Sequence, residues 1–220
     1  MMSELLKKFC DLLDLELRPN VDILSEDHHH PVTVKHYPQP WECLGKGNYA
    51  AVFNHPDFPE WVVKIYARNR TGFVEEAEVY QRIGSHPAFS ECYYAKDGLL
   101  VLKRLYGTTL YDCVHRGIPI SKTVIQDIDQ ALIYAKNCGL NPHDIHGKNV
   151  MVAADGRGLV VDISDFLEPE VCYAWPDLKR AYYWIYRPFI AGLQLKIPYT
   201  LLDQVRTIYR ILRRLGDRLR

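Results

Sequence analysis

Residues 41–105 constrain the fold most, because five short strand-like runs follow one another there with one helical pattern among them. The runs are rich in apolar and β-branched residues, which favour a pleated sheet. An Asp-Gly pair at 97–98 separates the last two runs and is typical of a tight hairpin. Residues 71–83 have apolar side chains at helical spacing, and Gly84 follows as a stop signal. This order predicts a five-stranded antiparallel sheet with one helix.

The N-terminal segment predicts less regular structure. Residues 3–17 place apolar side chains on one face of a short helix, whereas residues 18–40 contain four prolines and neither helical nor strand periodicity. We therefore expect a helix followed by a linker or irregular cover. Three consecutive histidines at 28–30 can bind a metal, but no neighbouring residue has zinc-like spacing, so an incidental surface run is the simpler interpretation.

From residue 106 the sequence is mainly helical. Ser121 can cap a long helix that ends at Gly139. Two short strands follow, joined by a turn at residues 155–158, and the chain from residue 176 is again helical. Breaks in this last part are expected near two prolines, Pro188 and Pro198.

The composition excludes several classes of protein. The 220 residues are 48% hydrophobic, which is enough to form a sizeable core, and the 27 basic residues balance the 27 acidic ones. No overall positive field is present of the kind that coats nucleic acid. Six cysteines without a CxxC pair argue against a zinc ribbon or a disulfide framework. Without a signal peptide or a long apolar run, we expect a soluble cytoplasmic protein with no transmembrane segment.

Two glycines, Gly45 and Gly47, lie where a strand turns back, so that backbone N–H groups there can approach phosphate oxygens. Alone, such a pair is equally typical of a tight turn. Lys64 follows in a later strand, between Val63 and Ile65. It can be a solvated edge charge, or its ammonium can bind phosphates if a carboxylate holds it in place.

The helix at residues 71–83 offers three carboxylates for that lysine, Glu75, Glu76 and Glu78. We favour Glu76, because the apolar side chains of Val79 and Tyr80 lie three and four positions later and hold the same side of the helix against the core. The other two glutamates remain alternatives.

A second group of polar residues carries the chemistry of the C-terminal half. Asp144 and Asn149 are five positions apart, and Asp162 follows across a short hairpin. One carboxylate can then accept a proton from an acceptor hydroxyl while Asn149 and Asp162 hold magnesium. Each residue alone is also common in turns and caps. The complete set in this order is harder to explain in that way.

The ordered set resembles the eukaryotic-like protein-kinase superfamily over residues 41–166. The resemblance implies an α+β, bilobal protein-kinase-like fold. Its N-lobe, a five-stranded antiparallel sheet plus one helix, would span about residues 41–105. A reduced, mainly helical C-lobe would span about residues 106–220, and residues 1–40 would form an extension.

The resemblance also implies ATP and Mg²⁺ as cofactors and a role for each matching residue. The catalytic residues would be Asp144 as base, Lys64 as phosphate clamp and Glu76 as its ion-pair partner. Asn149 and Asp162 would bind the metal. Leu102 would lie at the back edge of the adenine, and the backbone of Lys103 and Leu105 would hydrogen-bond to it. The full set of expected ATP contacts is Gly45, Gly47, Val52, Lys64, Lys103 and Leu105.

The sequence departs from the common protein-kinase pattern in several places. His143 replaces the arginine before the catalytic aspartate, which argues against control by activation-loop phosphorylation. Residues 162–164, Asp-Ile-Ser, resemble RIO-type atypical kinases. His146 replaces the lysine that ordinary Ser/Thr kinases have two residues after the catalytic aspartate. The resulting pattern at residues 144–149, Asp-Ile-His-x-x-Asn, resembles that of aminoglycoside and choline phosphotransferases. Only 58 residues follow Asp162, too few for a full C-lobe. Residues 176–181 resemble the helix that supports the catalytic loop in small kinases, with Asp177 as a candidate buried carboxylate.

We therefore expect a Mg-ATP-dependent phosphotransferase, with a Ser/Thr protein kinase of reduced size as the leading hypothesis. A nucleotide-binding pseudokinase or interaction module is one alternative, and a small-molecule phosphotransferase is another. The partner would be a protein or small-molecule phosphoacceptor.

The C-terminal helix carries one apolar stripe and many arginines. We expect the stripe to cover the C-lobe and the basic back to be solvated. An acidic partner, RNA or an anionic membrane at the basic side is the alternative. The stripe consists of Leu201, Val205, Ile208, Leu212, Leu215 and Leu219, and the arginines are Arg206, Arg210, Arg213, Arg214, Arg218 and Arg220.

Overall fold

The computed structural model describes residues 3–27, 30–193 and 195–218, with side chains up to Arg213 in the last helix. The described chain forms two compact units. Unit 1 contains the residues up to Leu105 together with Ala135–Asn141 and Ile163–Pro169, and unit 2 contains the rest. Each unit is described separately below. All six cysteines are free. Within the described residues, no helix is both long enough and apolar enough to span a bilayer.

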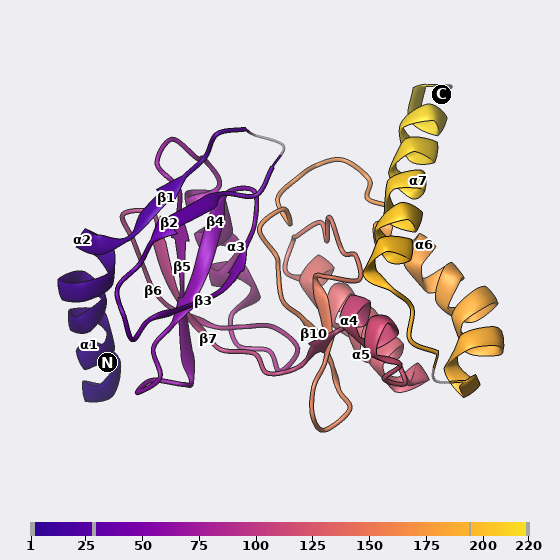
Figure 1. Cartoon of the computed structure of the whole chain (residues 1–220), viewed down its shortest axis with the longest axis horizontal. Coiled ribbons are helices and arrows are strands. Elements are labelled where there is room, and N and C mark those ends of the chain that lie inside the picture. Colours follow the sequence, from indigo (N-terminus) through magenta and orange to yellow (C-terminus); the bar gives the residue numbers. More distant parts are fainter. Residues whose placement is uncertain (1–2, 28–29, 194, 219–220) are drawn as a thin grey trace. The chain divides into compact units, whose positions relative to one another are not determined.

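Unit 1 is built on a five-stranded sheet in the order β3-β4-β5-β7-β6, in which every neighbouring pair is antiparallel (Figure 1). The predicted five-stranded sheet is therefore confirmed. The predicted helix is also present as α3, Phe73–Ile83, between Gly72 and Gly84. The strands are β3 Glu42–Lys46, β4 Ala50–Asn54, β5 Trp61–Tyr66, β6 Cys92–Lys96 and β7 Leu99–Lys103.

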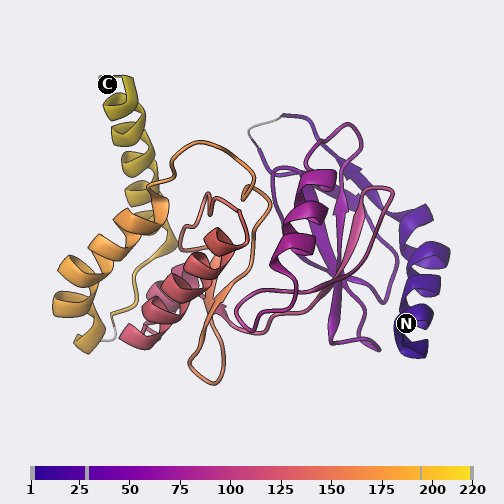
Figure 2. The same cartoon turned by 180° about the vertical axis from the view of Figure 1, so that it is seen from behind.

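The N-terminal segment packs against this sheet and shares its core, as both views of the chain show (Figure 2). Fully buried Phe9 and Leu13 contribute to that core together with Trp41. The expected linker at residues 18–40 is wrong in part, because it contains an antiparallel pair of strands. Strands of three and four residues are too short to produce a readable alternation of apolar side chains. The elements are α1 Glu4–Leu12, η1 Leu13–Leu17, α2 Arg18–Asn20, β1 Asp22–Leu24 and β2 Thr33–His36.

The predicted histidine run lies mostly outside the described residues, which exclude His28 and His29. His30 is exposed, and its Nδ1 lies 2.7 Å from Oδ2 of Asp27. Within the described chain, no group of three or more His, Cys, Asp or Glu side chains has the arrangement of a metal site.

Unit 2 combines helices with a three-stranded sheet in the order β10-β9-β8. The long helix expected after Ser121 is present, as are the two expected strands, but α4 had no sequence signal that we recognised. Pro188 lies inside the π-helical η2, where a break was expected; a widened turn relieves the clash between a proline ring and the preceding turn. The elements are β8 Thr108–Thr109, α4 Leu110–Arg116, α5 Lys122–Asn137, β9 Val150–Val152, β10 Gly158–Val160, α6 Ala174–Ala181, η2 Tyr182–Ile190, η3 Ala191–Leu193 and α7 Tyr199–Arg218.

Gly158 allows β10 to lie directly on α5. A Cβ atom at this position would lie 2.5 Å from the carbonyl oxygen of Val124 and 2.9 Å from Cγ1 of Ile128. The Gly158 N–H also donates to Oδ2 of Asp127, at 3.0 Å. The missing side chain therefore sets the position of the β9–β10 hairpin on the helix.

The apolar stripe of α7 remains largely exposed, so our expectation that it is buried against unit 2 is wrong. Leu201, Val205, Ile208 and Leu212 are 49–62% exposed, and the side chains of Leu215 and Leu219 lie outside the described residues. Instead, the face of α7 next to the apolar stripe packs against the rest of unit 2. That face carries Leu202, Arg206, Tyr209 and Arg213, all of them half-buried.

Asp177 on α6 forms hydrogen bonds with the inward face of α7. Its Oδ2 accepts hydrogen bonds from Tyr209 Oη at 2.9 Å and from Arg213 Nε at 2.8 Å. Burial opposes ionisation of this carboxyl group, but the hydrogen bonds from Arg213 and Tyr209 outweigh burial and lower its pKa. Asp177 is a structural carboxylate as expected, yet it is only half-buried and its hydrogen bonds join α6 to α7.

Replacing Gly158 by alanine should lower the free energy of unfolding by about 1–3 kcal/mol, because the added methyl group overpacks the contact with α5. Urea denaturation measures the change. Gly192→Ala is the matched control, since a Cβ atom there has nothing within 4 Å. Equal effects of the two substitutions would contradict the role given to Gly158.

Asp177→Asn should lower the free energy of unfolding by about 1–3 kcal/mol at pH 7, because Arg213 and Tyr209 lose a charged acceptor. A carboxyl group with a lowered folded-state pKa stabilises the fold above its unfolded pKa, and this contribution is lost as the pH falls through the folded value. The difference between variant and wild type should therefore shrink towards pH 3 in urea titrations. A difference that stays constant with pH would contradict this assignment.

Candidate functional site

Unit 1 carries a buried ion pair between its sheet and its helix. Lys64, on β5, places its Nζ atom 2.9 Å from Oε1 and 2.8 Å from Oε2 of Glu76 on α3. The Lys64 side chain is 13% exposed and that of Glu76 only 1%. Burying a charge is costly unless a partner compensates it, so each residue holds the other in place.

The structure distinguishes among the three candidate glutamates. Glu76 lies on the buried side of α3 and also accepts a hydrogen bond from the Tyr66 hydroxyl group. Glu75 is exposed, and Glu78 forms an ion pair with Arg82 on the same helix. Glu76 is therefore the partner of Lys64, as the apolar spacing on α3 indicated.

The glycine-containing turn joins β3 to β4 and is closed by a hydrogen bond from the Gly47 N–H to the carbonyl of Ala50, at 2.9 Å. Neither Gly45 nor Gly47 has a positive φ. A Cβ atom would have nothing within 4 Å at Gly45 and only the Ala50 oxygen, at 3.8 Å, at Gly47. The Gly47 carbonyl also accepts a hydrogen bond from the Val32 N–H at 2.8 Å. The fold does not require the two glycines for packing, and no side chain blocks the approach of a ligand to this turn. Val52, on β4, is half-buried and pairs in register with Lys64.

The structure narrows the predicted adenine contacts at the end of β7. The Lys103 N–H donates to the carbonyl of Glu91 at 2.8 Å, and the Lys103 carbonyl accepts a hydrogen bond from Ser90 Oγ at 2.7 Å. The Lys103 backbone therefore has no free N–H to donate, but its carbonyl oxygen can still accept a second hydrogen bond, for example from the adenine. The Leu105 backbone makes no hydrogen bond within the described chain. Leu102 is buried, as expected of a residue behind a bound base.

In unit 2, Asp144 adopts a left-handed backbone conformation, with φ of 50°. Such a conformation costs a residue other than glycine about 1–3 kcal/mol and recurs at functional sites. Three hydrogen bonds hold it. The Asp144 N–H donates to Cys172 Sγ at 3.2 Å, and its carbonyl accepts from the His146 N–H and from Asn149 Nδ2, both at 3.0 Å. The Asp144 carboxylate is half-exposed and accessible to a substrate.

Asn149 directly precedes β9, and Asp162 follows two residues after the end of β10, so both lie at the open end of the β9–β10 hairpin. The Val161 N–H donates to the Asn149 carbonyl at 2.9 Å, which brings the residue before Asp162 next to Asn149. The hydrogen bond from Asn149 Nδ2 to Asp144 leaves Asn149 Oδ1 as the side-chain atom that can ligate a cation. One amide oxygen and one carboxylate are the hard donors that magnesium takes alongside phosphate oxygens and water.

His146 joins this loop to α7. Its Nε2 atom lies 3.6 Å from Oδ2 of Asp144 and 3.4 Å from Nη2 of Arg206. Burial lowers the pKa of His146 and Arg206 adds to this effect, although Asp144 and Asp162 act in the opposite direction. The neutral imidazole is therefore favoured beside the Asp144 carboxylate.

Arg206 and Cys172 lie beside the loop at residues 144–149, and no sequence feature predicted this. Both residues are far from it along the chain, and no local pattern connects them to it. The spacing of Leu202, Arg206, Tyr209 and Arg213 does place these four side chains on one face of α7, which was the available signal.

Comparison with known proteins gives one informative match. No model of a known protein family matches the chain. A protein of Bacillus subtilis (strain 168) named "Putative serine/threonine-protein kinase YrzF" is 30% identical over 179 residues. The aligned region covers 80% of this chain and 82% of that relative.

This similarity extends over most of both sequences and agrees with the five-stranded antiparallel sheet and the mixed α+β fold of the structure. It does not distinguish a RIO-like from an aminoglycoside-phosphotransferase-like member. The chain belongs to the kinase-like family of the Bacillus subtilis protein YrzF.

Proposed function

We propose that the protein is a Mg-ATP-dependent phosphotransferase of reduced size that transfers the ATP γ-phosphate to a Ser or Thr hydroxyl group of a protein. The observation that carries this proposal is the buried ion pair of Lys64 and Glu76. A lysine held by a buried carboxylate on the strand next to an open glycine turn is suited to binding phosphate oxygens. The name of the Bacillus subtilis relative supports the same reaction class.

Nucleotide binding would place the phosphates at the glycine-containing turn, where no side chain of Gly45 or Gly47 stands in the way, and would use the free backbone groups of Leu105 for the adenine. Asn149 Oδ1 and the Asp162 carboxylate fit magnesium, because both are hard oxygen donors. The bound metal would neutralise charge on the phosphate oxygens during transfer.

Asp144 would act on the acceptor. Its half-exposed carboxylate can accept the proton of a hydroxyl group and orient that group for attack. Its strained backbone is fixed by three hydrogen bonds, so that little reorganisation is needed at the moment of reaction. The neutral His146 leaves this carboxylate free of a full ion pair.

A small-molecule hydroxyl acceptor is the second candidate substrate. The observation that favours it is His146, which occupies the loop position beside Asp144 and is held there by Arg206. Protein and metabolite acceptors can be separated by offering each to the same purified enzyme with labelled ATP.

Substitutions should separate the two roles. We expect Lys64→Ala and Asp162→Asn to weaken Mg-ATP binding, because they remove the phosphate clamp and a metal ligand. Asp144→Asn should leave binding nearly intact and lower turnover at least about 100-fold, since it removes proton transfer and acceptor orientation. Transfer of label from γ-labelled ATP measures turnover, and thermal shift with Mg-ATP measures binding. Equal losses of binding in all three variants would contradict these assignments.

The glutamates of α3 provide a matched pair. Glu76→Gln should weaken Mg-ATP binding, because Lys64 loses its charged partner, whereas Glu75→Gln changes an exposed residue of the same helix and should have no effect. Nucleotide binding without label transfer to any protein or metabolite would overturn the enzymatic proposal and favour a nucleotide-binding interaction module.

A further inference from the structure

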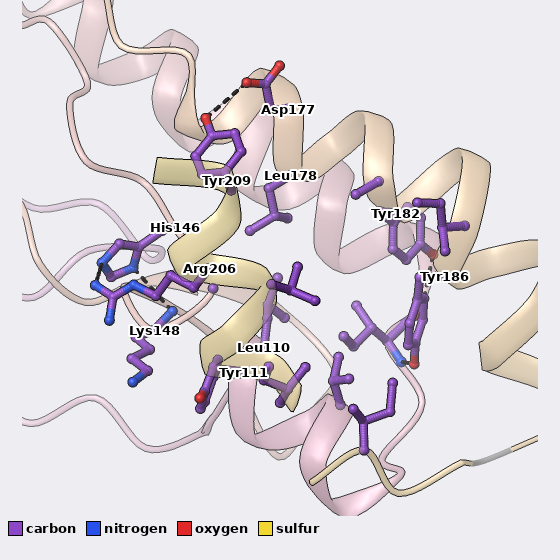
Figure 3. Close-up of a pocket in the computed structure, with 18 of the residues that line it drawn as sticks. Leu110, Tyr111, His146, Lys148, Asp177, Leu178, Tyr182, Tyr186, Arg206 and Tyr209 are labelled. Carbon is purple, nitrogen blue, oxygen red and sulfur yellow. Dashed lines mark hydrogen bonds between the residues drawn. The ribbon is translucent and has the colours of Figure 1, made fainter. Parts of the chain in front are cut away.

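Unit 2 contains a cavity of about 500 Å³ that the proposed phosphotransfer does not use. Its walls come from α4, the catalytic loop, α6 with η2, and the first turns of α7 (Figure 3). This volume is within the range of roughly 300–1,000 Å³ that is typical of small-molecule sites.

Most of the cavity wall is apolar, including Leu110, Val114, Leu178, Ile190 and Ile197. Two tyrosines also line it, but their hydroxyl groups are occupied by the backbone. Tyr182 Oη donates to the carbonyl of Ile120 at 3.1 Å, and Tyr186 Oη accepts from the Ile120 N–H at 3.0 Å. This part of the wall therefore suits an aliphatic chain, which needs no hydrogen bonds.

Charged side chains line the opposite end of the cavity: the cations Arg206 and Lys148, and the Asp177 carboxylate, which already accepts hydrogen bonds from Tyr209 and Arg213. Figure 3 shows Arg206 and His146 at one end and Tyr182 and Tyr186 at the other. Arg206 is half-buried and contacts the imidazole of His146, and in the described part of the chain no carboxylate forms an ion pair with it. A half-buried cation without a carboxylate partner is favourable only if an anion or water compensates it.

The cavity is accessible from solvent along an apolar rim. Leu201, Val205 and Ile185 line the cavity and are nevertheless 49–58% exposed. Their exposure leaves a path by which an apolar ligand can enter without passing a polar barrier.

We propose that this cavity binds an amphiphile with an aliphatic chain and an anionic head group, the chain lying among the apolar side chains and the head group against Arg206. The chemistry is that of a fatty acid or of the acyl part of an anionic lipid. Binding does not depend on phosphotransfer. A bound head group would touch His146 and hence the loop that carries Asp144.

The first test fills the cavity. Isothermal titration of the full chain with decanoate should show one saturable site. Ala181→Trp should weaken it at least tenfold, because Ala181 lines the cavity and is exposed enough to accept a larger side chain. Ala154→Trp is the matched control, since this exposed alanine in the β9–β10 turn does not line the cavity. Decanoate binding that is the same in both variants would overturn the proposal.

The second test concerns the head group. Arg206→Gln should weaken decanoate binding about tenfold, the loss expected for a charge-assisted hydrogen bond, and should leave decanol binding unchanged. Arg210→Gln, an exposed arginine one turn further along α7, should affect neither ligand. Equal losses for decanoate and decanol in Arg206→Gln would contradict recognition of an anion.

A third experiment distinguishes whether the bound aliphatic chain belongs to a lipid in a bilayer or to a free amphiphile. Sedimentation with phosphatidylglycerol and phosphatidylcholine vesicles tests lipid in a bilayer, whereas decanoate tests a free amphiphile. Binding to either probe that is lost in Ala181→Trp supports the proposal and names the source. Absence of binding to both decanoate and phosphatidylglycerol would overturn it, as would a cavity that only mediates self-association in analytical ultracentrifugation.

Discussion

The carboxylate of Glu76 is almost completely buried, and this one constraint determines much of unit 1. A charged group without access to water must receive its hydrogen bonds from the protein, here from Lys64 and Tyr66, which are two residues apart on β5. Helix α3 therefore has one favourable orientation on the sheet. The same pair keeps a lysine ammonium group next to β4, the strand that leaves the glycine-containing turn, so that stability and the proposed phosphate binding depend on a single interaction.

Much of unit 1 could be predicted because its signals are local. The Asp-Gly hairpin at 97–98 and the helix stop at Gly84 each act within a few residues. The strands of the five-stranded sheet are long enough for their apolar and β-branched composition to be recognised. The two-stranded sheet at the N-terminus escaped prediction because its strands are very short. In α7, periodicity identified the faces correctly but not which face turns inward. The inward face carries Tyr209 and Arg213, whose hydrogen bonds to Asp177 join α7 to α6, and no local sequence pattern indicates this pairing.

The residues of the candidate site likewise fall into those that local sequence patterns predicted and those that only the tertiary fold brings together. Asp144, Asn149 and Asp162 were found because the loop and hairpin that carry them are continuous in sequence. Arg206 and Cys172 were missed because only the tertiary fold brings them to that loop. The expectation for the Lys103 backbone stays a prediction, but the structure narrows it to the carbonyl group. The Lys103 N–H already donates to the Glu91 carbonyl, and a hydrogen bond of this kind between chain segments cannot be read from residue type.

The glycines of the chain differ in what they are needed for. At Gly158 the missing side chain is required by packing against α5, whereas Gly45 and Gly47 have open space and ordinary backbone angles. A mutation at Gly158 would therefore lower the abundance of the protein in a cell, since less stable chains are removed by quality control. A small substitution in the glycine turn would leave a normal amount of altered protein. Loss-of-function alleles at these positions would thus be distinguishable by protein level alone.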